Sequence, residues 1–160
     1  MAATTAQLLQ ELLETAQSVE TFGDRSFKIF NMEEIKQRAE FQGYPVVVVG
    51  YEGAIPAPGN QGLGAQGRAS GACDAVIVNK RFTIMVGVEY NYQGELDDDN
   101  KDVATDLLDE VRGKLLGFQG VNSKPWRFVA EGPSNDYLDG VIFYAQTWET
   151  QSTLTGNDAQ

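Results

Sequence analysis

Apolar residues recur at helical spacing in two long stretches of the chain. At about residues 5–19, Leu8, Leu9, Leu12, Leu13, Ala16 and Val19 share one face. At about residues 100–116, Val103, Leu107, Leu108, Val111 and Leu115 do the same. Thr4 or Thr5 is suited to cap the first helix, and Gly117 to end the second. The pattern predicts two main amphipathic helices, with a shorter helix at about 31–39.

Shorter apolar runs predict strands at about 26–30, 45–51, 73–78, 82–90, 126–131 and 141–150. The four consecutive residues Val46–Val49 indicate a strand buried on both faces. Asn79-Lys80-Arg81 lies between two of the runs and predicts a hairpin turn. Gly53–Gly71 is rich in Gly, Pro, Ala and Gln, and we expect it to be a long loop.

These elements predict an α+β fold: a mixed or antiparallel β-sheet with a β-hairpin, flanked by two main α-helices. The chain has 160 residues, which suits one domain with a sizeable core. We expect that domain to span residues 1–151. Residues 152–160 are mostly polar, and we expect them to be a flexible tail.

The charge balance narrows the choice of partners. The formal net charge is −11, which opposes non-specific binding to nucleic acid and docking on anionic lipid. The longest apolar run, Val46–Val49, is far too short to span a membrane. The N-terminus lacks a basic region followed by an apolar run, so we expect no signal peptide and synthesis in a cytoplasm-like compartment.

The usual catalytic residues are scarce. The chain has no histidine and one cysteine, Cys73, which excludes an intrachain disulfide and a Cys/His metal cluster. Acidic pairs such as Glu33-Glu34 and Asp109-Glu110 are most simply solvated helix faces. We therefore expect no enzyme, although a small hydrolase that uses two carboxylates stays open as an alternative.

Two motifs resemble ligand sites. Gly62 to Gly67 matches the dinucleotide-binding pattern GxGxxG, but Pro56 to Asn60 separates it from the preceding strand and a strand follows it. Asp97 to Asn100 lacks the alternating ligands of a calcium loop and suits a helix N-terminus instead. We expect no cofactor and no metal, although a cation bound at Asp97–Asn100 between subunits stays open.

Aromatic side chains with polar groups recur late in the chain, and such residues often anchor protein interfaces. We predict that subunits pair through strand edges at Phe82–Tyr90 and Val141–Thr150. The loop Gly53–Gly71 is expected to become ordered against a neighbouring subunit. The candidate interface residues are Gly62, Gly64, Arg68, Phe82, Ile84, Val86, Tyr144 and Trp148.

Several segments together resemble a known family. They are Tyr44 to Gly53, which ends in Tyr-Glu-Gly; Val111 to Gln119, which contains Leu-Leu-Gly-Phe; Pro125-Trp-Arg-Phe; and Val141 to Glu149, which ends in Ala-Gln-Thr-Trp-Glu. In this order, after an N-terminal helix, they resemble the tail terminator (tail completion) proteins of Mu-like phages and prophages. The resemblance covers most of the chain.

The resemblance implies a structural virion protein located in the tail and neck. It implies a homo-oligomeric ring, six-fold, at the head-proximal end of the tail tube, which stops polymerisation of tube and sheath and joins the tail to the neck. Expected partners are tube, sheath and neck or connector proteins, and genomic DNA would pass through an acidic lumen without specific binding. Another tail or neck component, such as a tube or connector protein, is the alternative within this class.

Overall fold

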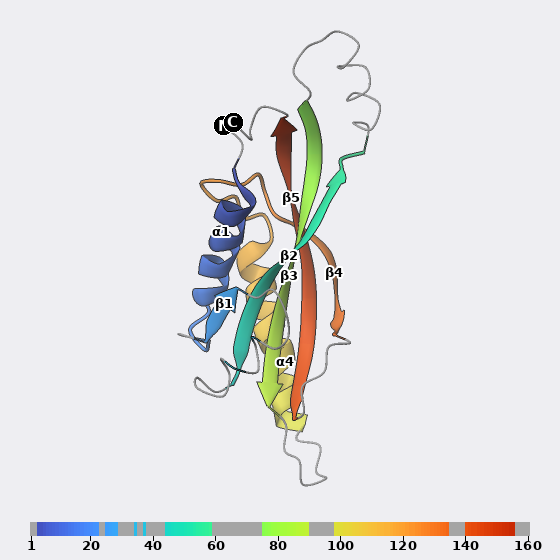
Figure 1. The fold of residues 1–160 in the computed structure, drawn as a ribbon. Coiled ribbons are helices and arrows are strands. Elements are labelled where there is room, and N and C mark those ends of the chain that lie inside the picture. Colours follow the sequence, from blue (N-terminus) through green and yellow to red (C-terminus); the bar gives the residue numbers. More distant parts are fainter. Residues whose placement is uncertain are drawn as a thin grey trace.

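The computed structural model describes residues 3–22, 25–28, 34, 37, 44–58, 75–89, 98–134 and 140–155. Within these ranges the chain forms the expected α+β fold, in which two helices pack on a mixed sheet of five strands (Figure 1). The elements are α1 (Thr5–Gln17), β1 (Ser26–Lys28), β2 (Val46–Pro56), β3 (Ala75–Glu89), α4 (Asp98–Leu115), β4 (Arg127–Pro133) and β5 (Val141–Thr155).

The strands lie in the order β1-β2-β3-β5-β4. β1 runs parallel to β2, and every other neighbouring pair is antiparallel. β3 and β5 pair along their whole length, from Ala75 opposite Thr155 to Glu89 opposite Val141. The sheet is therefore built around one long central ribbon, with β2 and β4 on its two sides.

The main core lies between the sheet and the helices. Apolar side chains of α1 and α4 pack there against alternate residues of β2, β3 and β5. The strand side of this core consists of Val47, Val49, Phe82, Ile84, Val86, Val88 and Trp148. Both helices therefore cover the same face of the sheet, which we call the helix face.

A smaller core lies on the opposite face. It contains Phe27, Val46, Val48, Met85, Val141 and Phe143. The valines of β2 thus divide between the two cores, which confirms the predicted burial on both faces. Gly87 is needed at this place, because a Cβ there would lie 2.7 Å from a ring carbon of Phe143.

The predicted hairpin turn at Asn79-Lys80-Arg81 is wrong. β3 continues through these residues, and all three pair with β5. The antiparallel neighbours that follow each other in sequence are instead β2 with β3 and β4 with β5.

Three strands run further than expected. β2 continues to Pro56 and β4 to Pro133, each through residues predicted to be loop. β5 continues to Thr155, so residues 152–155 of the expected flexible tail belong to the sheet.

The helix ends follow the sequence signals. Thr4 caps α1 in a capping box, in which Thr4 Oγ1 accepts from Gln7 N and Gln7 Oε1 accepts from Thr4 N. Gly117 follows α4 with a φ of +73°, a conformation that favours glycine. Glu34 and Gln37 are helical, as expected for the short helix at 31–39, whose other residues lie outside the described ones. None of the described helices has the length and apolar character required to cross a membrane.

Candidate functional site

The side chains predicted to form a subunit interface lie mainly in the core. Phe82, Ile84, Val86 and Trp148 are completely buried, and Tyr144 is half-buried against them. Phe82, Ile84, Val86 and Trp148 therefore stabilise the subunit and present no surface to a partner, which contradicts the prediction for these four residues. The Tyr144 side chain stays partly exposed, so its place at an interface remains a prediction. The other candidates, Gly62, Gly64 and Arg68, lie outside the described residues, as does most of the loop 53–71.

The predicted edge strands are also wrong. β3 has β2 on one side and β5 on the other, and β5 has β3 and β4. The outer strands of the sheet are β1 and β4. Backbone groups in the middle of β3 are already paired, so they cannot bind a neighbouring strand.

Open backbone edges occur instead at one end of the sheet. β1 pairs with β2 only at Val47–Val49, and β4 pairs with β5 only from Tyr144 to Glu149. Beyond these points residues 50–56, 75–82 and 150–155 form a three-stranded part, which we call the sheet tip (Figure 1, top). Among the described residues no strand pairs with the outer edge of β2 or of β5 in the tip.

Exposed apolar side chains gather at the tip. Ile55 and Leu154 are each 43% exposed, and Ile77 is 39% exposed. Tyr51 is 42% exposed and its ring lies 5.2 Å from that of Phe82. Burying such side chains against another protein would be favourable.

Two carboxylates are buried, and each has a structural partner. Glu11 of α1 accepts hydrogen bonds from the backbone N–H of Asn122 (3.0 Å) and from Trp126 Nε1 (3.3 Å). Glu149 of β5 forms ion pairs with Arg81 of β3 and Arg127 of β4. These contacts hold the 120–126 segment on α1 and join three strands, so neither carboxylate is placed as a catalytic base.

A second polar network links α4 to the sheet. The Gln146 side chain is fully buried; its Nε2 donates to the Leu108 carbonyl (2.8 Å) and to Glu131 (2.7 Å), and its Oε1 accepts from Trp148 Nε1 (3.0 Å). Glu131 also pairs with Arg112 at 2.6 Å. Hydrogen bonds to Glu131 and Asp109 raise the pKa of Arg112 above its ordinary value. The network positions α4 on the sheet.

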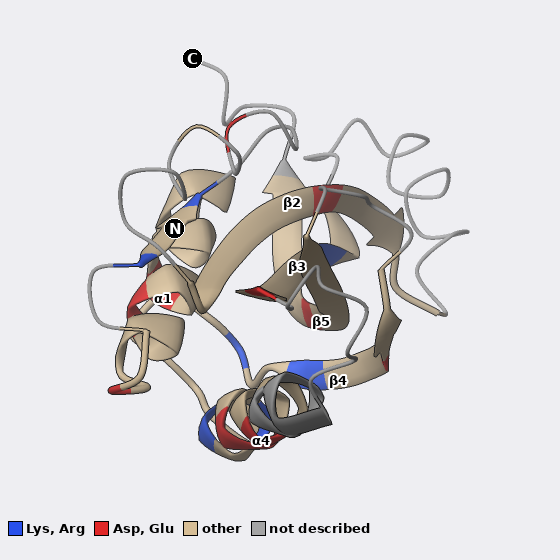
Figure 2. Cartoon of the chain, turned by 90° about the horizontal axis from the view of Figure 1, so that it is seen from below, with Lys and Arg blue, Asp and Glu red and all other residues tan. Residues whose placement is uncertain are grey.

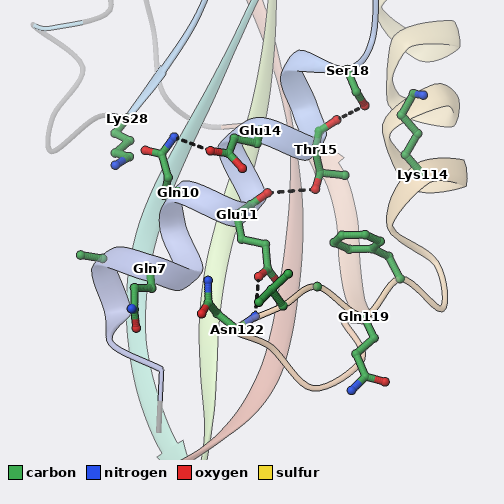
Figure 3. A pocket seen from close by; sticks show the side chains of 14 residues that line it. Gln7, Gln10, Glu11, Glu14, Thr15, Ser18, Lys28, Lys114, Gln119 and Asn122 are labelled. Atoms are coloured by element: carbon green, nitrogen blue, oxygen red, sulfur yellow. Dashed lines mark hydrogen bonds between the residues drawn. The ribbon is translucent and has the colours of Figure 1, made fainter. Parts of the chain in front are cut away.

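The surface has two open grooves beside the 118–124 segment. The larger, of about 960 Å³, runs along the outer face of α1, with Lys28 and Lys114 among its lining side chains (Figure 3). Glu11 lies at its floor and points toward Asn122. The smaller, of about 450 Å³, is lined by Ala3, residues 119 and 121–124, and Gln151–Thr153 of β5. It therefore adjoins the open edge of β5.

The described part of the chain contains no group of three Cys, Asp or Glu side chains that could hold a metal ion. α4 begins at Asp98, in agreement with a helix start in the Asp97–Asn100 run; the side chains of that run lie outside the described residues. No protein-family model matches the sequence, and no curated protein matches it either.

The open edges of the sheet tip could not be predicted from the sequence, because they depend on where β1 and β4 end. Residues 150–155 carry no charge and no proline, and this was a weak signal for a strand. The run was too polar to be recognised as part of a strand.

Proposed function

We propose that this chain is a structural subunit of a phage tail, similar to the tail terminators, that assembles into a homo-oligomeric ring at the head-proximal end of the tail tube. In that place the ring would stop polymerisation of tube and sheath and bind the neck proteins. The proposal assigns the chain no catalysis and no cofactor.

One observation carries the proposal beyond the sequence resemblance. The two open edges of the sheet tip belong to β2 and β5, which flank β3 on opposite sides. A subunit with different binding edges on opposite sides can contact its neighbours head to tail, and such contacts close into a ring when the rotation fits. The α+β architecture also agrees with the fold that the resemblance implies.

The charge distribution is compatible with DNA passing through the ring. Exposed acidic side chains lie on α1 and α4, and the chain as a whole is strongly acidic (Figure 2). Such a surface lacks the dense Lys and Arg contacts that retain DNA. DNA should therefore pass through the proposed ring without specific binding.

The proposal is tested by measuring the mass of the purified chain by native mass spectrometry over a range of concentrations, and by imaging the particles with negative-stain electron microscopy. Closed rings of uniform size support it. Adding the rings to polymerising tube protein from the same phage should shorten the tubes, with one ring at an end. A chain that stays monomeric with and without tube protein would contradict the proposal.

Tube and connector proteins are the alternative within the same class, and the same experiment separates them. A tube protein would extend into stacked rings of indefinite length, whereas a terminator stops at one ring. A connector would form rings without affecting tube length.

A further inference from the structure

The open edge of β5 is unguarded. Proteins usually protect exposed strand edges with charges, prolines or bulges. β4, the outer strand of the same sheet, has all three: a bulge between Phe128 and Ala130, the charge of Glu131, and Pro133 at its end. Residues 150–155 of β5 have no charge and no proline, and their register with β3 is regular. Among the described residues, this edge therefore carries none of the usual protective features.

The register shows which backbone groups face outward. Because the Ser134 N–H donates to the Phe143 carbonyl, Phe143 faces the β4 side, and in a regular strand every second residue does so too. Gln151 and Thr153 therefore point their N–H and C=O groups away from β3, whereas Ser152 pairs with Val78. The outward backbone groups of Gln151 and Thr153 are two donors and two acceptors.

A groove gives a strand access to this edge. The 450 Å³ groove separates Gln151–Thr153 from the 121–124 segment, and the Ser152 hydroxyl beside it is buried without a hydrogen-bond partner among the described residues. Val121 stands on the far wall of the groove and is 100% exposed. An incoming strand would pair with β5 on one side and cover Val121 on the other.

We propose that this slot receives the end of β2, residues 53–56, from a second copy of the chain. The inference rests on the proposed ring and specifies its subunit contact. β2 and β5 both run antiparallel to β3, so they point in the same direction. A neighbour's β2 placed on the β5 edge therefore continues the sheet with a parallel pair, and repetition of this contact carries the sheet from subunit to subunit.

The β2 end matches the slot in charge and through the backbone of Ala54. The Ala57 N–H donates to Ile77, so Ile55 also faces β3, and Ala54 and Pro56 face outward. Ala54 offers both its N–H and its C=O to a neighbour, whereas Pro56 offers only its C=O, and a bulge between Tyr51 and Gly53 bounds this part of the edge. Residues 53–56 carry no charge, and neither do residues 150–155. Two copies that are each formally −11 can therefore approach through these edges without bringing carboxylates together.

Proline substitutions separate assembly from folding. Thr153→Pro and Ala54→Pro each remove one outward N–H and leave the β3 ladder intact. We expect both variants to fold, by circular dichroism and thermal unfolding, and to weaken self-association by roughly tenfold or more. Ser152→Pro is the matched control: it removes an N–H that faces β3, so it should destabilise the fold itself.

Mixing the two variants identifies the partner strand. Thr153→Pro keeps an intact β2 end and Ala54→Pro keeps an intact β5 edge, so an equimolar mixture should form heterodimers and no ring in native mass spectrometry. If Ala54→Pro alone forms dimers and Thr153→Pro does not, β5 pairs with a second β5 and the proposal is overturned. If both variants form normal rings, the tip is not the contact, although the proposed ring function would stand.

A side-chain variant keeps the proposal testable if a proline disturbs the fold. Val121→Asp changes a fully exposed side chain on the groove wall, so the subunit should fold normally and self-associate at least several-fold more weakly. Val129→Asp, in the exposed bulge of β4, is the control and should leave assembly unchanged. Equal assembly of both variants and the wild type would overturn the proposal.

Discussion

At the scale of single residues, Glu11 and Gly120 form an interdependent pair. The Glu11 carboxylate lies so close to Gly120 that a Cβ there would collide with it. Gly120→Ala should therefore displace the carboxylate from Asn122 and Trp126 and leave buried donors unpaired, at a cost of roughly 1–3 kcal/mol. Urea unfolding measures this loss.

The losses of stability caused by substitutions at Glu11 and Gly120 should not be additive. Once Glu11→Ala has removed the carboxylate, the added methyl of Gly120→Ala no longer meets the three atoms nearest to it, so the double variant should be about as stable as Glu11→Ala alone. Additive losses would mean that Gly120 is needed for another reason. Gly113→Ala provides the control, because a Cβ at Gly113 meets no atom within 4 Å.

Lys80 makes stability depend on pH. Its side chain is buried on the helix face, where Nζ donates to Thr5 Oγ1 at 3.1 Å, and burial lowers the pKa of Lys80 below its ordinary value. Below the folded-state pKa the buried cation is present and destabilises the fold. As the pH rises from there toward the unfolded-state value, the folded protein releases the proton first and the penalty disappears.

Lys80→Met should therefore be more stable than the wild type at about pH 7, by roughly 1 kcal/mol, and the difference should shrink toward about pH 10. Urea unfolding at the two pH values measures this change. Lys114→Met, which alters an exposed lysine, should show no comparable trend. A difference that stays constant with pH would mean that the pKa of Lys80 is not lowered in the folded protein.

At the scale of elements, the sequence predicted what depends on local spacing. The faces of α1, the cap at Thr4, the buried valines of β2 and the alternation along β3 all follow from periodicity within a few residues. The turn predicted at Asn79-Lys80-Arg81 was wrong because two of its polar side chains have distant partners. Lys80 reaches Thr5 and Arg81 reaches Glu149, so a run that is typical of a turn stays in the strand.

The prediction of the interface residues was wrong for a related reason. Whether an aromatic side chain faces a core or a partner depends on which strands are central, and strand order has no local signature. Trp148 alternates with polar neighbours as an interface residue would, but it is buried with Phe82 and its Nε1 bonds to Gln146. The open edges became visible only when the end points of β1 and β4 were known.

Because β3 lies at the centre of the sheet, a proline at Val86 should affect folding. Val86 lies opposite both Val47 and Tyr144, so its backbone is in the middle of the sheet. Val86→Pro removes a ladder donor and introduces a ring into a fully buried position, and we expect it to prevent folding rather than to impair assembly alone. Loss of the folded far-UV circular dichroism spectrum is the expected result, whereas Thr153→Pro should keep it. A folded Val86→Pro subunit would mean that β3 tolerates a local break.

At the scale of the whole molecule, one subunit combines an acidic surface with two uncharged edges. α4 alone exposes Asp106, Asp109 and Glu110, and the basic side chains Arg81, Arg112 and Arg127 are paired with carboxylates within the subunit. These three arginines are therefore poorly placed to attract the acidic surface of a second copy. In the proposed ring, backbone pairing and apolar contact would have to hold the copies together against their mutual repulsion.

Salt should consequently strengthen the assembly. Added ions screen the repulsion between copies that are each formally −11, while hydrogen bonds and apolar contacts at the tip are little affected. Raising NaCl from about 50 mM to about 500 mM should lower the concentration at which half the subunits are assembled, by roughly threefold or more. Sedimentation velocity measures this midpoint. Replacing exposed acids on α4, as in Asp106→Asn with Glu110→Gln, should move the midpoint in the same direction at low salt and have less effect at high salt.

Dissociation of the rings by salt would instead mean that ion pairs between copies hold them together, and the free edges of β2 and β5 would then not be the main contact.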